Sequence, residues 1–105
     1  MEGTFSQRLK ELRAERRQTL DEVSEGVNRM LGTRISKGQL SRFEKGENKA
    51  SIDNAIALSI YFGVSLDYML GLADDRQIRQ MDRLMAYAER FRELNETENK
   101  KEVEL

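Results

Sequence analysis

The sequence predicts an all-α fold built from five short helices. A hydroxyl residue able to cap a helix recurs along the chain, and apolar residues spaced three and four apart follow it each time. The expected helix starts lie at Thr4, Thr19, Ser36, Ser51 and Ser65. The segments between the helices are short, and the chain contains no proline. Short helices joined by short connections make mostly local contacts, which is typical of a small helical domain.

The first two helices should each begin with a capping box, in which a Ser or Thr and a Glu or Gln three residues later bond to each other's backbone N–H groups. Thr4 and Gln7 predict such a box for a helix over about 5–17, and Thr19 and Glu22 predict the next one. The apolar face of the second helix is expected to consist of Leu20, Val23, Val27 and either Met30 or Leu31.

The third expected helix, over about 36–45, separates apolar from polar side chains. Ser36 and Gln39 predict its capping box, while Leu40 and Phe43 give it an apolar stripe. The hydrogen-bond donors on its other face are Lys37, Gln39, Ser41, Arg42 and Lys45. A short helix of this kind is suited to a DNA major groove, and the alternative is an ordinary surface helix whose cations are merely solvated.

Positive charge is concentrated around this third helix. Residues 29–49 contain six basic and two acidic side chains, although the whole chain has a net charge of −1. Residues 50–75 contain four acidic side chains and no basic one. A local excess of positive charge is what binding to nucleic-acid phosphates requires.

The composition argues against several other classes of function. The 105 residues include no cysteine and no histidine, which leaves no thiolate or imidazole for metal binding or nucleophilic catalysis. We therefore expect no enzyme, no metal site and no cofactor. Neither a signal peptide nor a membrane-spanning run is apparent, so cytoplasmic residence is the expectation.

The fourth and fifth helices are expected to start at Ser51 and Ser65 and to end at Gly63 and Gly71. The residues suited to the inward face of the fourth helix are Ile52, Ala55, Leu58, Ser59 and Phe62. Ile56 and Ile60 then lie on a second face of the fourth helix. A helix that is apolar on nearly all sides is usually covered on both, so another segment should cover this pair.

Residues 76–105 are expected to follow the domain of residues 1–75 as a separate segment, with an amphipathic helix over about 76–95 and a charged tail. The apolar residues of this helix are Ile78, Met81, Leu84, Met85, Ala88, Phe91 and Leu94. Because such a helix is marginal in water by itself, its stripe should be buried. It either folds back on the fourth helix or pairs with the same helix of a second chain, and we expect a homodimer.

Four motifs occur in the order typical of helix-turn-helix domains of the phage-repressor/Cro (XRE) type. They are FSQRLKELR at 5–13, TLDEV at 19–23, ISKGQLSRFEKG at 35–46 and AIALSIYFGVSLDYMLGL at 55–72. The chain therefore resembles this family of DNA-binding regulators. The resemblance implies a five-helix lambda-repressor-like domain that acts as a sequence-specific transcriptional regulator on double-stranded DNA. It further implies a repressor that binds a palindromic operator as a homodimer.

An alternative function is an antitoxin or adaptor module, in which the C-terminal helix mainly binds a partner protein. A charged tail that becomes ordered on binding would suit this function. The two functions can coexist in one chain. A regulatory protein partner is possible for a DNA-binding regulator as well.

The resemblance also assigns roles to individual residues. It implies that Lys37, Gly38, Gln39 and Arg42 contact DNA bases, with lysine suited to guanine and glutamine to adenine. The expected phosphate contacts are Thr19, Arg29, Arg34, Ser36, Ser41, Lys45, Asn48 and Lys49. Arg13 and Glu44 are expected to form a structural ion pair, against the alternative of an exposed, unpaired glutamate. The residues expected in a dimer or helix-packing interface are Ile56, Ile60, Ile78, Met81, Met85 and Ala88.

The sequence departs from the family pattern in three places. About six residues, 29–34, are inserted before the third helix, and they either lengthen the second helix or make a wing-like turn. Their two arginines either contact phosphates or only add solubilising charge. Leu20 occupies a position where many members have a glutamine that reaches a phosphate, so that contact is in doubt. Ala50 replaces the proline that commonly precedes the fourth helix.

Overall fold

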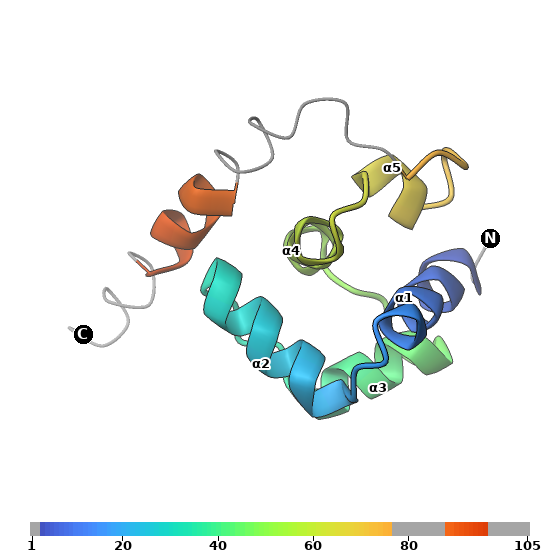
Figure 1. Ribbon diagram of the computed structural model, residues 1–105, viewed down its shortest axis with the longest axis horizontal. Coiled ribbons are helices and arrows are strands. Elements are labelled where there is room, and N and C mark those ends of the chain that lie inside the picture. The colour runs from blue at the N-terminus through green and yellow to red at the C-terminus, as the bar shows by residue number, and fades with distance from the viewer. Residues whose placement is uncertain (1–2, 77–87, 97–105) are drawn as a thin grey trace.

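The computed structural model describes residues 3–76 and 88–96, and every regular element within these two ranges is a helix (Figure 1). The labelled helices are α1 (Gly3–Glu15), α2 (Leu20–Leu31), α3 (Lys37–Lys45), α4 (Ile52–Phe62) and α5 (Leu66–Met69). Residues 88–96 form a further helical stretch near the C-terminus. The predicted fold class, five helices followed by a C-terminal helix, is confirmed.

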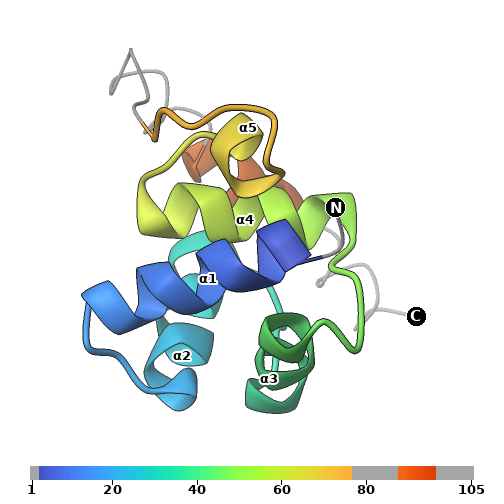
Figure 2. The same ribbon diagram turned by 90° about the vertical axis from the view of Figure 1, so that its right-hand side faces the viewer.

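Helix α4 lies at the centre of the domain, with α2 and α3 on one side and α5 on the other (Figure 2). Helix α1 contacts both α3 and α5, while α2 contacts α3 and α4. Residues 88–96 lie beside α2, away from α1 and α3 (Figure 1). This arrangement leaves α3 at the edge of the domain, supported by α1 and α2.

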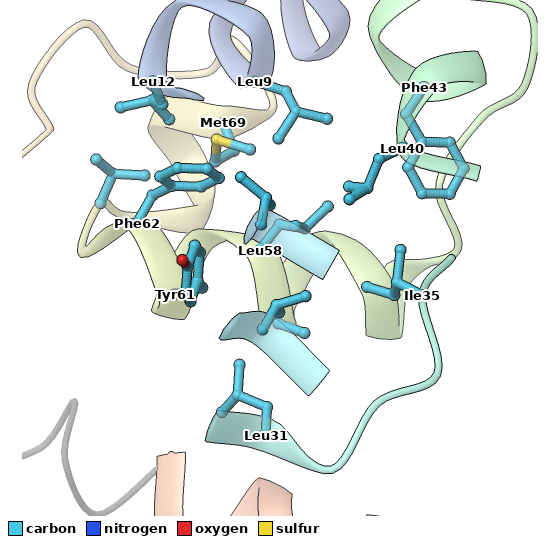
Figure 3. Packing of buried hydrophobic residues seen from close by; sticks show 14 of the residues in the cluster. Leu9, Leu12, Leu31, Ile35, Leu40, Phe43, Leu58, Tyr61, Phe62 and Met69 are labelled. Carbon is cyan, nitrogen blue, oxygen red and sulfur yellow. The ribbon is translucent and has the colours of Figure 1, made fainter. Parts of the chain in front are cut away.

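The core is formed by apolar side chains from all five labelled helices (Figure 3). Its largest fully buried members are Leu9, Val23, Val27, Leu31, Ile35, Leu40, Leu58 and Met69. Burying a side chain of this size contributes about 1.5–3 kcal/mol relative to leaving it exposed. Leu31, and not Met30, completes the apolar face of α2, because Met30 is 44% exposed.

The predicted caps at Thr19, Ser36, Ser51 and Ser65 are confirmed. Each side-chain oxygen accepts a hydrogen bond from the backbone N–H three residues later. The boxes at Thr19 and Ser36 are complete, since the residue three positions later also bonds back to the cap. These bonds use backbone donors that the helix itself leaves free, and so fix where three of the predicted helices and the short α5 begin.

The predicted capping box at the start of the first helix is wrong. Helix α1 begins at Gly3, so Thr4 lies within the helix and does not cap it. The Gln7 side chain donates instead to Glu11 Oε1, one turn later, at 3.2 Å. The helix also ends at Glu15, two residues earlier than expected, a difference within the usual uncertainty of a helix end.

The inward face predicted for α4 needs one correction. Ile52, the first residue of α4, is 59% exposed, whereas the other four predicted residues are buried. Ala57 and Tyr61 are buried in addition. Tyr61 can be buried because its hydroxyl group is hydrogen-bonded to the Gln18 side chain, with 2.8 Å between Gln18 Nε2 and Tyr61 Oη. Ile60 is half-buried and packs against the core.

Arg76, at the end of the first described range, is hydrogen-bonded to side chains of α1 and α5. Its Nη1 and Nη2 atoms donate to the Glu15 carboxylate at 2.8 and 2.9 Å, and its Nε donates to the Tyr68 hydroxyl at 3.0 Å. These bonds from Arg76 hold the pKa of the Glu15 carboxyl below its ordinary value. The domain's polar contacts therefore extend to Arg76, and the division between residues 1–75 and 76–105 stays a prediction.

The described part of the C-terminal segment folds back on its own domain. Asn95 Nδ2 donates to the Leu31 carbonyl oxygen at the end of α2, at 2.9 Å. Ala88 and Phe91 pack against the core, whereas Leu94 is 51% exposed and does not belong to the buried stripe. The remaining residues of the predicted stripe, which lie outside the described residues, are Ile78, Met81, Leu84 and Met85.

Candidate nucleic-acid interface

Helix α3 is anchored by its apolar face and exposes its basic face. Leu40 is fully buried, and Phe43 is 4% exposed. The exposed residues of the opposite face and of the cap are Ser36, Lys37, Gly38, Arg42 and Lys45, while Gln39 and Ser41 are half-buried. The side chains that the sequence assigned to one face of this helix are thus brought together on one surface.

Arg13 and Glu44 form the ion pair that the family resemblance implies. Arg13 Nε and Nη2 donate to the two carboxylate oxygens of Glu44 at 2.6 and 2.9 Å, and Arg13 Nη1 donates to the Gln18 carbonyl oxygen at 2.9 Å. The Glu44 side chain is only 8% exposed. Hydrogen bonding to this carboxylate raises the pKa of the Arg13 guanidinium above its ordinary value. The Arg13 side chain therefore connects α1, the turn that follows α1, and α3.

The connection between α2 and α3 is organised by Asn28, which the sequence did not single out. Asn28 Oδ1 accepts from the Ile35 N–H at 2.8 Å and from the Thr33 hydroxyl at 2.7 Å, and its Nδ2 donates to the Ile35 carbonyl oxygen at 2.9 Å. Ser24 Oγ donates to the same carbonyl oxygen at 2.6 Å. The first three inserted residues, 29–31, therefore extend α2, and the connection that follows is bonded to α2 through Thr33 and Ile35, directly before the cap of α3.

Replacing Asn28 with alanine should lower the free energy of unfolding by about 2 kcal/mol, because the backbone N–H of buried Ile35 loses its partner and its carbonyl oxygen keeps only the bond from Ser24. Urea unfolding measures this change, and hydrogen exchange should accelerate at Ile35. Glu25→Ala, on the exposed surface of the same helix, is the matched control and should stay within about 0.5 kcal/mol of wild type. Equal stability of the two variants would show that Asn28 does not hold the connection.

Comparison with known proteins identifies this arrangement. Residues 9–69, more than half of the chain, match the family described as Helix-turn-helix. The chain belongs to this helix-turn-helix family. A relative from Bacillus subtilis (strain 168), described as "Uncharacterized HTH-type transcriptional regulator YobD", is 31% identical over 71 residues, which cover 68% of this chain. The match spans 58% of that relative, less than two thirds of its length. No solved structure matches the chain significantly.

The family match confirms the resemblance to the phage-repressor/Cro (XRE) type of DNA-binding regulators. In a helix-turn-helix protein the second helix of the motif is the one that enters the major groove, while the first lies across the DNA backbone. In this chain α2 and α3 occupy these two places.

The N-termini of the two motif helices lie next to each other. Lys37 Nζ is 3.7 Å from Asp21 Oδ2, and because both side chains are more than 60% exposed the pair contributes little to stability. The Thr19 N–H already donates to Glu22 Oε1 at 2.9 Å. The Thr19 hydroxyl accepts from the Glu22 N–H and can still donate to a phosphate, but the Glu22 and Asp21 carboxylates belong to the same helix turn. The Thr19 contact stays a prediction that two acidic side chains oppose.

The other predicted phosphate contacts lie at different distances from α3. Lys45 and Lys49 are exposed at the end of α3 and in the loop after it. Arg29 lies in the last turn of α2, about 12 Å along the helix axis from Asp21. Arg34 is exposed in the connection before α3. Leu20 packs against the core, so the position that often carries a phosphate-binding glutamine is used for packing here.

Within residues 3–76 and 88–96, no group of three or more acidic side chains is arranged to hold a metal ion. None of the helices in these same ranges has the length and apolar character needed to cross a bilayer.

Proposed function

We propose that this helix-turn-helix protein is a sequence-specific transcriptional regulator that binds double-stranded DNA through α3. The observation that carries the proposal is the exposed basic face of α3, whose N-terminus is capped by Ser36 and whose opposite face is held in the core by Leu40 and Phe43. Lysine and arginine recognise the guanine O6/N7 edge, and glutamine recognises adenine N6/N7. We propose Lys37, Gly38, Gln39 and Arg42 as the base contacts. The proposed phosphate contacts are Thr19, Arg29, Arg34, Ser36, Ser41, Lys45 and Lys49.

Selection of bound duplexes from a random DNA pool tests this function directly. We expect enrichment of one sequence, with an affinity that falls steeply as salt concentration rises. Lys37→Ala should remove the preference at one base pair, whereas Lys49→Ala should weaken binding to all duplexes by a similar factor. A pool that shows no enrichment, or a Lys37→Ala protein with unchanged preferences, would overturn the assignment.

Gln39 serves the helix cap, and one substitution separates this role from base recognition. Its Oε1 accepts from the Ser36 N–H at 2.9 Å, so a bidentate contact with adenine would have to open the capping box. Gln39→Glu keeps an acceptor for the cap, and stability should stay within about 0.5 kcal/mol of wild type. The new carboxylate cannot donate to a base and repels phosphates, so affinity for the selected duplex should fall at least about tenfold. Fluorescence anisotropy measures this loss, and unchanged affinity would contradict it.

We further propose that the protein binds a palindromic operator as a homodimer and acts as a repressor. One α3 reads only a half-site, and two-fold symmetry of the protein would match two-fold symmetry of the operator. Ala88 and Ile60 both pack on their own domain, so the proposed dimer contact involves the other members of the predicted interface. Ile60 is unsuitable for a test, because an aspartate there would also disturb the core.

Met85→Asp is the test of the dimer, read by sedimentation equilibrium beside wild type. We expect the fraction of dimer to fall and the selected operator to bind more weakly. An unchanged sedimentation profile would remove Met85 from the interface. Affinity capture that returns a stable partner protein, together with only non-specific affinity for DNA, would favour the antitoxin or adaptor function instead.

A further inference from the structure

The loop that follows α3 is connected to a side chain of the proposed base-reading surface. With the Asn48 amide oriented so that both of its ends find partners, Asn48 Oδ1 accepts from Arg42 Nε at 3.0 Å and its nitrogen donates to the Glu47 carbonyl oxygen at 2.9 Å. The backbone N–H groups of Glu47 and Asn48 also donate to the Arg42 carbonyl oxygen, at 2.9 and 3.4 Å. Asn48 therefore contacts both the backbone and the guanidinium of one arginine.

The Arg42 guanidinium lies back over the first turn of α3. A Cβ atom added to Gly38 would lie 3.4 Å from Arg42 Nη1 and 4.0 Å from Nη2. Long side chains in helices usually point toward the N-terminus in this way. Because both residues are exposed, the absence of a side chain on Gly38 leaves the end of the guanidinium open to a ligand in front of the helix.

The contact with Asn48 determines which donors of Arg42 remain available. Nε is occupied by Asn48 Oδ1, so the two terminal nitrogens are the pair that can donate side by side. Two parallel donors match the O6 and N7 acceptors of guanine, the commonest specific contact in the major groove. A restrained arginine also loses less rotamer freedom when it binds than a free one does.

We propose that Asn48 is a positioning residue, which holds Arg42 over Gly38 so that its terminal nitrogens read a guanine. This proposal rests on the proposed DNA-binding function and changes the role expected for Asn48 from phosphate contact to orientation of Arg42. The base reading by α3 then depends on Arg42, beside the bare turn at Gly38, more than on Gln39, whose amide oxygen serves the cap.

A double-mutant cycle on the complete chain tests the proposal. Duplexes selected from a random pool by wild type and by Arg42→Ala identify the base pair at which Arg42 prefers guanine. Asn48→Ala should reduce that preference about tenfold, the size of one good base contact, and leave the other positions unchanged. In the Arg42→Ala background, Asn48→Ala should change affinity by less than about twofold, because Asn48 affects base recognition only by positioning Arg42.

Lys49→Ala is the matched control in the same loop. As a phosphate contact it should weaken binding by the same factor with and without Arg42, and at every sequence. If Asn48→Ala behaves like Lys49→Ala, Asn48 is itself a phosphate contact and the proposal is overturned, while the proposed function stands. If wild type prefers no sequence, the proposed function and this inference both fail.

The contact itself can be measured without DNA. In nuclear magnetic resonance spectra of the free protein, the Arg42 Nε–H signal should be protected from exchange with water and should lose that protection in Asn48→Ala. Lys49→Ala should leave the signal unchanged. An Arg42 Nε–H that exchanges equally fast in wild type and Asn48→Ala would overturn the proposal whatever the DNA measurements show.

Discussion

Replacing Glu44 with alanine should lower the free energy of unfolding by about 2–3 kcal/mol, because it leaves the Arg13 guanidinium in a half-buried position without its carboxylate. The loss should be smaller than for a fully buried pair, since the Arg13 side chain is 23% exposed and water can reach it. Arg13 would keep only its bond to the Gln18 carbonyl oxygen. Urea unfolding monitored by circular dichroism measures the change.

Two further variants separate the ion pair from a general effect of removing charge. Glu47→Ala removes an exposed acidic side chain three residues later and should change stability by less than about 0.5 kcal/mol. Arg13→Ala combined with Glu44→Ala should be less destabilised than the sum of the two single variants, because removing both partners leaves no unpaired charge. If the losses of stability in the two single variants add up in the double variant, Arg13 and Glu44 do not interact directly. If Glu44→Ala is as stable as Glu47→Ala, the ion pair does not stabilise the fold.

Local chemistry made much of the fold predictable from the sequence. The caps at Thr19, Ser36, Ser51 and Ser65 involve residues only three positions apart, so their bonds can be recognised without knowledge of tertiary structure. The division of α3 into buried and exposed faces follows from helical spacing in the same way. Thr4 shows the limit of this reasoning, because the same pattern occurs there inside a longer helix.

Contacts between distant segments account for what the sequence did not predict. Asn28 looks like an ordinary polar residue of a helix, and only the course of the chain after α2 brings Ile35 to its side chain. Asn48 likewise acquires its contact with Arg42 from the turn of the loop after α3. The Arg13–Glu44 pair joins residues 31 positions apart and was expected from the family resemblance, since no local pattern indicates it.

Gly26 is another residue whose role depends on a contact with a distant segment, and replacing it should have a large effect on stability. It lies in the middle of α2, where a glycine normally weakens a helix by about 0.5–1 kcal/mol relative to alanine. A Cβ added there, however, would lie 2.7 and 2.8 Å from two ring carbons of Tyr61 in α4. Contacts this short require the helices to separate or the ring to move.

The Tyr61 ring has little freedom to move away. Its hydroxyl is hydrogen-bonded to the Gln18 side chain, its edge packs against Phe62 at 5.0 Å between ring centroids, and the Arg16 guanidinium lies 5.2 Å from its centre. Gly26→Ala should therefore lower the free energy of unfolding by about 1–3 kcal/mol, as overpacking does in other cores. Chemical unfolding of the variant measures the loss.

Gly38→Ala is the matched control, because it makes the same substitution at an exposed position of a helix. A Cβ there would meet nothing nearer than 3.4 Å, so alanine should leave stability unchanged or raise it by up to about 1 kcal/mol. The two variants should then change stability in opposite directions. Adding Tyr61→Leu to Gly26→Ala should cost less than the sum of the single changes, because the smaller side chain removes the clash. Additive losses, or a stabilised Gly26→Ala protein, would show that the distance between α2 and α4 is not set by Tyr61 lying against the bare backbone of Gly26.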